Sequence, residues 1–195
     1  PIHAALAHAL EHVTAMAELE LNAAADNPLV IATSGQVLST GNFHTPALAL
    51  AFEALGLAVA QAAAASAARF IQLTGSGRNG LPRYLSPEGG PSAGFVPLQK
   101  TVTALMARIR HKANPVMLDF LPVSEGVEDH ATQSTLTVEK LRDMLDLWRR
   151  LIACELLAAA QAIDLRPSHR CGEGSSRTYA FARRHASFAA QDRPL

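Results

Sequence analysis

The densest group of side chains that could do chemistry lies at residues 125–130, where the sequence is Glu-Gly-Val-Glu-Asp-His. Carboxylates and an imidazole this close together could hold a divalent metal or exchange protons with a substrate. The consecutive residues Glu128, Asp129 and His130 would point in different directions around a helix, however, so they could not converge on one ion. The chain also has no H-E-x-x-H motif. We therefore expect no metal site.

The acids of this segment have a structural interpretation beside the chemical one. A helix carries partial positive charge at its N-terminus, where acidic residues are favoured. A long helix is predicted to begin at about residue 125, so Glu125 and Glu128 could simply stabilise its first turn. In the chemical interpretation, a functional site lies near Glu128, at the same helix start.

Two further patterns carry less weight. The chain has no G-x-S-x-G string, which argues against a serine hydrolase built on a nucleophile elbow. A basic run, Arg108 to Lys112, falls at the end of a predicted helix, where cations are favoured by the dipole. That run is either structural or a contact for an anion or a partner.

Long helices must position these residues. Between residues 2 and 24, apolar side chains recur at three- and four-residue steps, which predicts an amphipathic helix. Further helices are predicted over 46–73, 98–113 and 125–165, with a short one near 176–190. Residues 29–31 could form a short strand, and 74–97 a long functional loop. The predicted fold class is all-α, a bundle of long helices in a single domain over 1–195.

Composition and charge exclude several classes of protein. The 195 residues are 49% hydrophobic and 17% charged, which argues against disorder. Lys and Arg number 17 and Asp and Glu 17, so there is no basic surplus for binding nucleic acid. The two cysteines form no C-x-x-C motif, and the chain opens with no signal peptide pattern. We expect a cytoplasmic protein.

The segment 46–73 is apolar on almost every side. A membrane span is one interpretation, but Gln61 and Ser66 lie inside the run and its flanks lack aromatic or basic anchors. A helix that is apolar all round is better explained as the centre of a bundle, and we expect no membrane contact. The segment has too few polar positions to face water, so we also expect the chain to be oligomeric.

Seven strings, taken in order, resemble one family. The chain is similar to the C-terminal part of the histidine, phenylalanine and tyrosine ammonia-lyases and aminomutases, over nearly its whole length. The strings are LNAAADNPLV (21–30), GNFH (41–44), NGLPRYL (79–85), SAGFVPLQ (92–99), ANPV (113–116), VEDHAT (127–132) and ELLAAAQAIDLR (155–166).

The resemblance implies an all-α homotetramer with active sites built from several subunits. It also implies a methylidene-imidazolone electrophile, formed from an Ala-Ser-Gly tripeptide, that turns the substrate amine into a leaving group while a base removes a β-proton. Lyase and aminomutase chemistry both remain open, as does the identity of the aromatic amino acid substrate.

The resemblance also implies roles for individual residues. Phe43 matches the phenylalanine that lines the substrate pocket, and Glu128 matches an acidic residue close to the electrophile. We assign Glu128 as catalytic and Phe43 as substrate-binding. The neighbours Asn42 and His44 belong to the same substrate-binding motif, with a role that is mainly structural, as for Asp26 and Asn27.

The chain departs from the family pattern where the electrophile should be. It contains no Ala-Ser-Gly, and Thr33-Ser34-Gly35 falls where the family has a surface turn. The catalytic tyrosine loop, an asparagine near the electrophile and the Y-S-x-R string are also absent. The position before Glu128, usually Gln, is Val127.

These departures leave three hypotheses. The chain is one subunit of a split lyase whose N-terminal half is a second chain, or a fragment of a full-length lyase, or a non-catalytic helical scaffold that binds small amines or aromatics. An initiator Met before Pro1 would normally be removed, so the chain could begin at its natural start, which favours the split enzyme.

Overall fold

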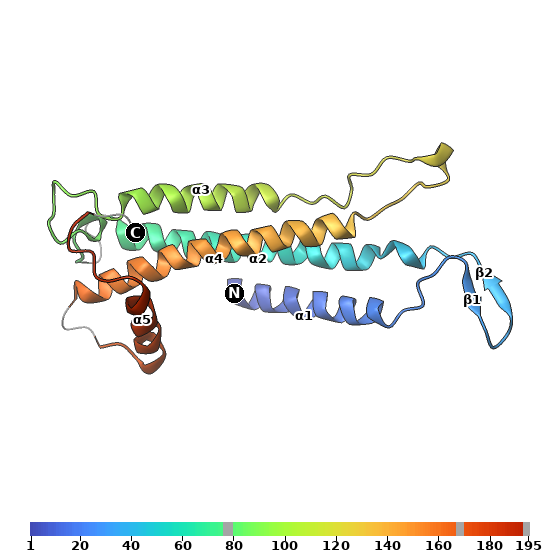
Figure 1. Cartoon of the computed structure of the whole chain (residues 1–195), viewed down its shortest axis with the longest axis horizontal. Coiled ribbons are helices and arrows are strands. Elements are labelled where there is room, and N and C mark those ends of the chain that lie inside the picture. The colour runs from blue at the N-terminus through green and yellow to red at the C-terminus, as the bar shows by residue number, and fades with distance from the viewer. Residues whose placement is uncertain (76–79, 167–169, 193–195) are drawn as a thin grey trace. The chain divides into compact units, whose positions relative to one another are not determined.

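Helices dominate the computed structural model, which describes residues 1–75, 80–166 and 170–192 (Figure 1). The all-α prediction is confirmed, because the helices take up more than half of the chain. The only strands in the described residues form one antiparallel hairpin, β1 (Leu29–Ile31) and β2 (Gln36–Leu38), where a strand at 29–31 was predicted. The α-helices of the described part are α1 (Ile2–Leu21), α2 (Pro46–Thr74), α3 (Val96–Lys112), α4 (Ser134–Asp164) and α5 (Glu173–His185).

Most helix boundaries follow from local sequence signals. Helix α2 begins at Pro46, whose fixed φ and missing N–H suit the first helical position. Helix α3 ends with Arg110, His111 and Lys112 in its last turn, as expected for cations near a helix C-terminus. Helix α5 lies three to five residues earlier than predicted. Within the predicted loop 74–97, residues 76–79 lie outside the described residues.

The predicted start of the fourth helix at 125 is wrong, because α4 begins at Ser134. Three successive residues, Ser124, Glu125 and Gly126, have φ values of 54°, 58° and 86°, and Gln133 has 50°. A right-handed helix cannot continue through left-handed residues. Glu125 and Glu128 are therefore not first-turn acids of α4, and the helix-dipole interpretation of these residues is wrong.

The chain divides into two compact units. Unit 1 comprises Pro1–Ala62 and Arg110–Leu145, and unit 2 comprises Ala63–Ile109 and Asp146–Leu195. The boundaries fall inside α2, α3 and α4 and not in a linker.

Unit 1 contains an ion pair in its interior. Glu53 of α2 and Lys140 of α4 are 5% and 8% exposed, and the ammonium donates a hydrogen bond to the carboxylate. Lys140 Nζ also donates to the carbonyl of Asn114 at 2.7 Å, and Glu53 Oε1 accepts from the backbone N–H of Val116 at 2.7 Å. The pair therefore ties the turn after α3 to both long helices.

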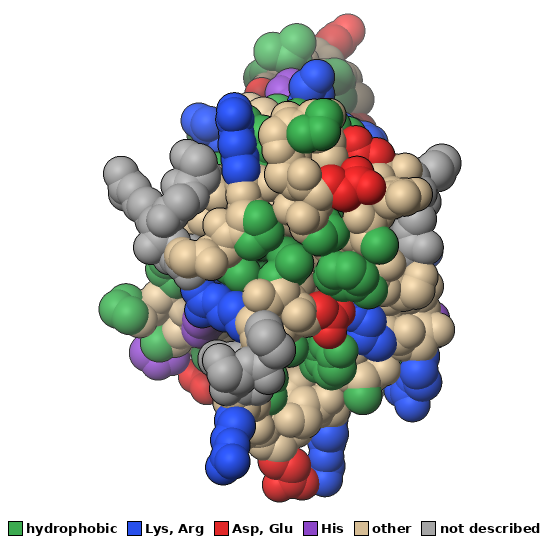
Figure 2. Space-filling model, turned by 90° about the vertical axis from the view of Figure 1, so that its left-hand side faces the viewer, with side chains coloured by type: hydrophobic (Ala, Val, Ile, Leu, Met, Phe, Trp, Pro, Cys, Tyr) green, Lys and Arg blue, Asp and Glu red, His purple; other side chains and the backbone are tan. Residues whose placement is uncertain are grey.

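Unit 2 has an apolar core and a carboxylate that links two of its helices. Phe70, Ile109 and Leu151 are fully buried. Glu155 of α4 accepts hydrogen bonds from Ser66 and from the guanidinium of Arg69, both on α2. Figure 2 faces the end of this unit that carries α5 and shows hydrophobic side chains at its centre, with basic side chains around them.

Helix α2 is long and apolar enough to cross a membrane by length and composition alone. In the structure it carries the buried ion pair of Glu53 and the buried hydroxyls of Ser66 and Thr74. Its buried face is therefore part of the core, as the bundle interpretation predicted. Leu50 and Leu57 remain at least half exposed on the helix.

Candidate functional site

A pocket of about 680 Å³ in unit 1 collects most of the residues that the sequence singled out. One wall is the segment around Phe43, His44 and Thr45, and the other is the segment 127–135. Phe43 and Glu128, which lie 85 positions apart in the sequence, line the same cavity. Asn42 does not line it.

The first wall is a single 3-10 turn, η1 (Asn42–His44), placed directly before α2. The turn ends because Thr45 adopts φ 51° and ψ 43°, and Pro46 then begins the helix. Phe43 is 46% exposed, and its ring centroid lies 4.2 Å from that of His44. This wall therefore offers an accessible aromatic surface to the cavity.

The second wall leads out of a tight turn. Val123 and Glu128 pair as an antiparallel bridge. The distance from Val123 N to Glu128 O is 3.0 Å, and that from Glu128 N to Val123 O is 3.3 Å. The turn between them is the 3-10 element η3 (Ser124–Gly126), and the hydroxyl of Ser124 donates to Glu128 Oε1 at 3.0 Å. The carboxylate of Glu128 is thereby held by its own turn while the residue stays exposed at the pocket.

The two walls touch through their imidazoles and through hydroxyl groups. The rings of His44 and His130 meet edge to face with centroids 5.4 Å apart. The hydroxyl of Thr132 donates to the carbonyl of His44 at 2.7 Å. His130 and Thr132 were not assigned to a site from the sequence, although both lie inside the string VEDHAT, which was the available signal.

Asn42, Asp26 and Asn27 make local contacts in the hairpin region. The backbone N–H of Asn42 donates to the hydroxyl of Thr40 at 3.2 Å. Asn27 Oδ1 accepts from the N–H of Thr40 at 3.2 Å, and Asp26 Oδ1 accepts from the N–H of Asn27 at 2.8 Å. These bonds shape the chain leading into η1.

The string Thr33-Ser34-Gly35 forms an ordinary exposed turn between β1 and β2. The N–H groups of Ser34 and Gly35 both donate to the carbonyl of Ile31, and Gly35 has φ 70°. These residues do not line the pocket. They do not fit the electrophile-forming tripeptide in sequence or in position.

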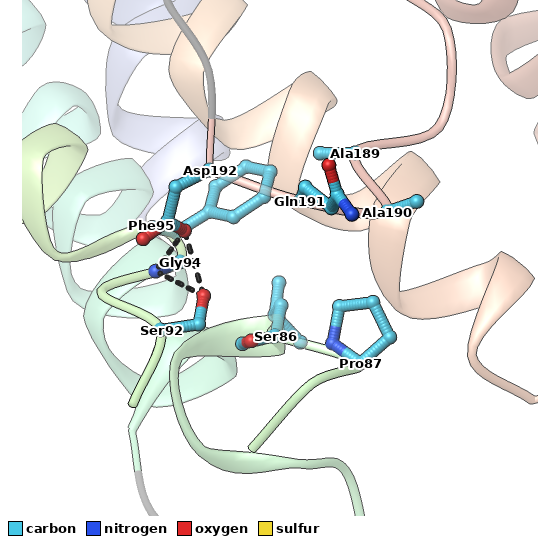
Figure 3. Close-up of a pocket in the computed structure, with 10 residues that line it drawn as sticks. Ser86, Pro87, Ser92, Gly94, Phe95, Ala189, Ala190, Gln191 and Asp192 are labelled. Atoms are coloured by element: carbon cyan, nitrogen blue, oxygen red, sulfur yellow. Dashed lines mark hydrogen bonds between the residues drawn. The ribbon is translucent and has the colours of Figure 1, made fainter. Parts of the chain in front are cut away.

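A second hollow, in unit 2, is far smaller, at about 20 Å³ (Figure 3). The carboxylate of Asp192 lies against the loop before α3, where it accepts hydrogen bonds from Ser92 Oγ at 2.7 Å and from the N–H groups of Ala93 and Gly94 at 2.8 and 2.9 Å. These bonds, among which that from Ser92 has the largest effect, hold the pKa of the Asp192 carboxyl below its ordinary value. The Asp192 carboxylate at this hollow thus has its hydrogen-bond donors within the chain.

Metal ligands do not gather in the part of the chain that the structure describes, since no three His, Cys, Asp or Glu side chains there could hold one ion.

Comparison with known families shows to which family the chain belongs. The family model described as aromatic amino acid lyase matches residues 1–184. The chain belongs to the aromatic amino acid lyase family. This confirms the family to which the seven strings pointed.

Several relatives of the chain are histidine ammonia-lyases. That of Alkaliphilus oremlandii is 35% identical over 194 residues, which are 100% of this chain and 38% of the relative. That of Aromatoleum aromaticum is 41% identical over 161 residues, covering 83% of this chain and 31% of the relative. This chain thus spans well under half the length of the relatives that it matches.

Solved structures of the aromatic amino acid lyase fold superpose closely on the chain. The ergothionase of Treponema denticola, an ergothioneine-degrading enzyme, has a TM-score of 0.94 and 32% identity, over 98% of this chain and 39% of that one. Histidine ammonia-lyase from Trypanosoma cruzi has a TM-score of 0.92 and 30% identity, over 99% and 38%.

Proposed function

We propose that the chain supplies one part of the active site of an ammonia-lyase that acts on an aromatic amino acid. The observation that carries the proposal is the pocket itself. The fold brings an accessible phenylalanine and an exposed carboxylate to one cavity from segments 85 positions apart, in a chain of the aromatic amino acid lyase family.

The lining of the pocket suits such a substrate. The rings of Phe43, His44 and His130 offer apolar and edge-to-face contacts to an aromatic side chain. The carboxylate of Glu128 can pair with the substrate ammonium and can accept or return a proton. We assign Glu128 the role of acid–base group and Phe43 that of ring contact with the substrate. The ring of His44 lies against that of Phe43.

The electrophile would come from residues outside this chain. A methylidene-imidazolone makes ammonia a better leaving group, and no tripeptide in this sequence can form one. We propose that it is supplied by the N-terminal part of the lyase, which these 195 residues do not contain, whether that part is a separate chain or precedes them in a longer one. The 195 residues then hold the substrate and move protons, but do not activate the amine alone.

Several features support an oligomer that works in a reducing compartment. Leu118, Leu121 and Val127, in and just before the second wall, are each about 80% exposed, which is unusual for large apolar side chains unless another surface covers them. Both cysteines are free thiols, as expected in the cytoplasm. We propose that partner chains cover the segment 118–127 in the assembled enzyme.

Histidine is the first substrate to assay, because the relatives from Alkaliphilus oremlandii and Aromatoleum aromaticum are named histidine ammonia-lyases. The chain is purified with whatever binds it in its source cells, and ammonia release is measured with histidine, phenylalanine and tyrosine. Mass spectrometry of the same sample identifies any second chain that carries a dehydrated tripeptide.

Glu128→Gln should abolish most of the ammonia release, by roughly 100-fold or more, because a positioned acid–base group contributes that much. Glu125→Gln is the matched control, since Glu125 lies in the same turn, is exposed and does not line the pocket. Equal effects of the two variants would overturn the role of Glu128. Binding of aromatic amines without turnover in every preparation would favour a non-catalytic scaffold.

A further inference from the structure

Three hydroxyls join the two walls of the pocket at the points where α2 and α4 begin. Thr132 Oγ1 lies 2.7 Å from the carbonyl oxygen of His44 and 2.7 Å from Ser134 Oγ. Ser134 Oγ lies 3.1 Å from Thr45 Oγ1. Thr132 is 5% exposed, so its hydroxyl is shielded from competing water.

The direction of these hydrogen bonds follows from proton counting. A hydroxyl carries one proton, and a carbonyl oxygen can only accept. Thr132 must therefore give its proton to His44, and its oxygen accepts from Ser134. Ser134 has then used its own proton, so it accepts from Thr45. The order Thr45 to Ser134 to Thr132 to His44 is the only one that satisfies every contact.

This chain of hydroxyls starts and ends on adjacent residues. It leaves the side chain of Thr45, passes through two residues of the second wall and returns to the carbonyl of His44. Hydrogen bonds therefore fix both residues of the His44–Thr45 peptide, at the carbonyl of His44 and at the side chain of Thr45. Thr45 and Gln133, at φ 51° and 50°, hold costly left-handed conformations that persist only where surrounding contacts enforce them.

We propose that Thr132 is a positioning residue of the pocket, which sets the spacing between the turn that carries Phe43 and the segment that carries Glu128. It acts through the carbonyl of His44 and through Ser134, and we assign it no contact with the reacting atoms. Its catalytic consequence rests on the function proposed above, whereas its structural consequence does not.

The matched variants are Thr132→Val, which keeps the shape and removes the hydroxyl, and Thr132→Ser, which keeps the hydroxyl. Thr103→Val is the control, because Thr103 is an exposed helix residue whose hydroxyl bonds only the carbonyl of Gln99 within its own helix. If Thr132→Val fails to fold, Ser134→Ala breaks the same series of bonds at its middle.

The first measurement needs no activity. Nuclear Overhauser contacts between the rings of His44 and His130 are recorded on the full chain. We expect them to weaken in Thr132→Val and to persist in Thr132→Ser and Thr103→Val. Unchanged contacts in a folded Thr132→Val would overturn the proposal, whether or not the chain is part of a lyase.

The second measurement uses the active complex. Displacing a pocket wall by about 1 Å can cost up to 100-fold in rate. We therefore expect kcat/KM to fall about 10- to 100-fold in Thr132→Val, with recovery to within a few-fold of the original in Thr132→Ser. Loss in both variants, or in neither, would overturn the positioning role. If the original chain shows no turnover in any complex, the proposed function fails and the ring contacts alone decide.

Discussion

Removing Lys140 should be among the most destabilising single changes in unit 1. The side chains of Lys140 and Glu53 are 8% and 6% exposed, so water cannot replace the ammonium once it is gone. Lys140→Met would leave the Glu53 carboxylate with the N–H of Val116 and the weak 3.4 Å contact from Thr137. It would also leave the carbonyl of Asn114 without its donor. Breaking a buried pair from one side costs about 3–5 kcal/mol.

The assay is urea unfolding followed by circular dichroism, with the midpoint and the slope compared between variants. Lys112→Met is the matched control, because the Lys112–Asp143 pair is 30% and 59% exposed, and such pairs contribute about 1 kcal/mol or less. We expect the loss of unfolding free energy for Lys140→Met to exceed that of the control by about 2 kcal/mol or more.

The double variant Glu53→Leu, Lys140→Met sharpens the test. It removes the unpaired charge, so it should lose less free energy than the sum of its two single variants. Equal losses for Lys140→Met and Lys112→Met would refute the reasoning, because the pair would then behave as a solvated one.

Three further outcomes are expected. The pKa of the Asp192 carboxyl is lowered in the folded state, so the ionised carboxylate should stabilise the loop before α3 at pH values above the ordinary carboxyl pKa of about 3.9. This stabilisation should be lost as the pH falls through the lower folded pKa. The NMR signal of the Gly94 amide should report the pH dependence, and Asp192→Asn should remove it. Phe43→Ala should raise KM about 5- to 30-fold with a smaller change in kcat, since it deletes roughly 1–2 kcal/mol of ring contact. Sedimentation of the chain at micromolar concentration should show an oligomer, and a stable, well-folded monomer would contradict the partner contacts proposed for the segment 118–127.

The helices were predictable because apolar periodicity and proline determine them. Pro46 marks the start of α2, and the basic turn at 110–112 marks the end of α3. The start of α4 was missed by nine residues. Apolar periodicity does not reveal whether a residue has a positive φ. The residue types at the positive-φ positions, Ser124, Glu125 and Gln133, occur in helices as well as in left-handed turns. Gly126 was the only local hint.

The site was predictable in part. The resemblance pointed to Phe43 and Glu128, and the fold places both at one pocket, although their chemical roles remain predictions. The series of bonds through Thr45, Ser134 and Thr132 was not predictable. It depends on two segments 88 residues apart meeting at hydrogen-bond distance, and single threonines carry no pattern that reveals such a contact.

Helices α2 and α4 are joined at two levels within unit 1, and this has a consequence for the pocket. The hydroxyls of Thr45, which directly precedes α2, and of Ser134, the first residue of α4, join the two helix starts, and the pair of Glu53 and Lys140 joins the helices about two turns further on. Thr137 belongs to the second level, because its hydroxyl reaches Glu53 Oε1, and it lies one turn from Ser134. A change at either level should therefore loosen the other.

Thr132→Val and Lys140→Met should consequently be non-additive. Residues that share a network typically show coupling of about 0.5–3 kcal/mol, whereas independent sites add to within about 0.3–0.5 kcal/mol. Once the ion pair of Glu53 and Lys140 is gone, the starts of α2 and α4 are less well fixed. The hydrogen bonds of the Thr132 hydroxyl then contribute less to the free energy of unfolding. The double variant should lose less unfolding free energy than the two single losses combined. Strict additivity in urea unfolding would mean that the pocket is positioned by its hydroxyls alone, independently of the ion pair beneath them.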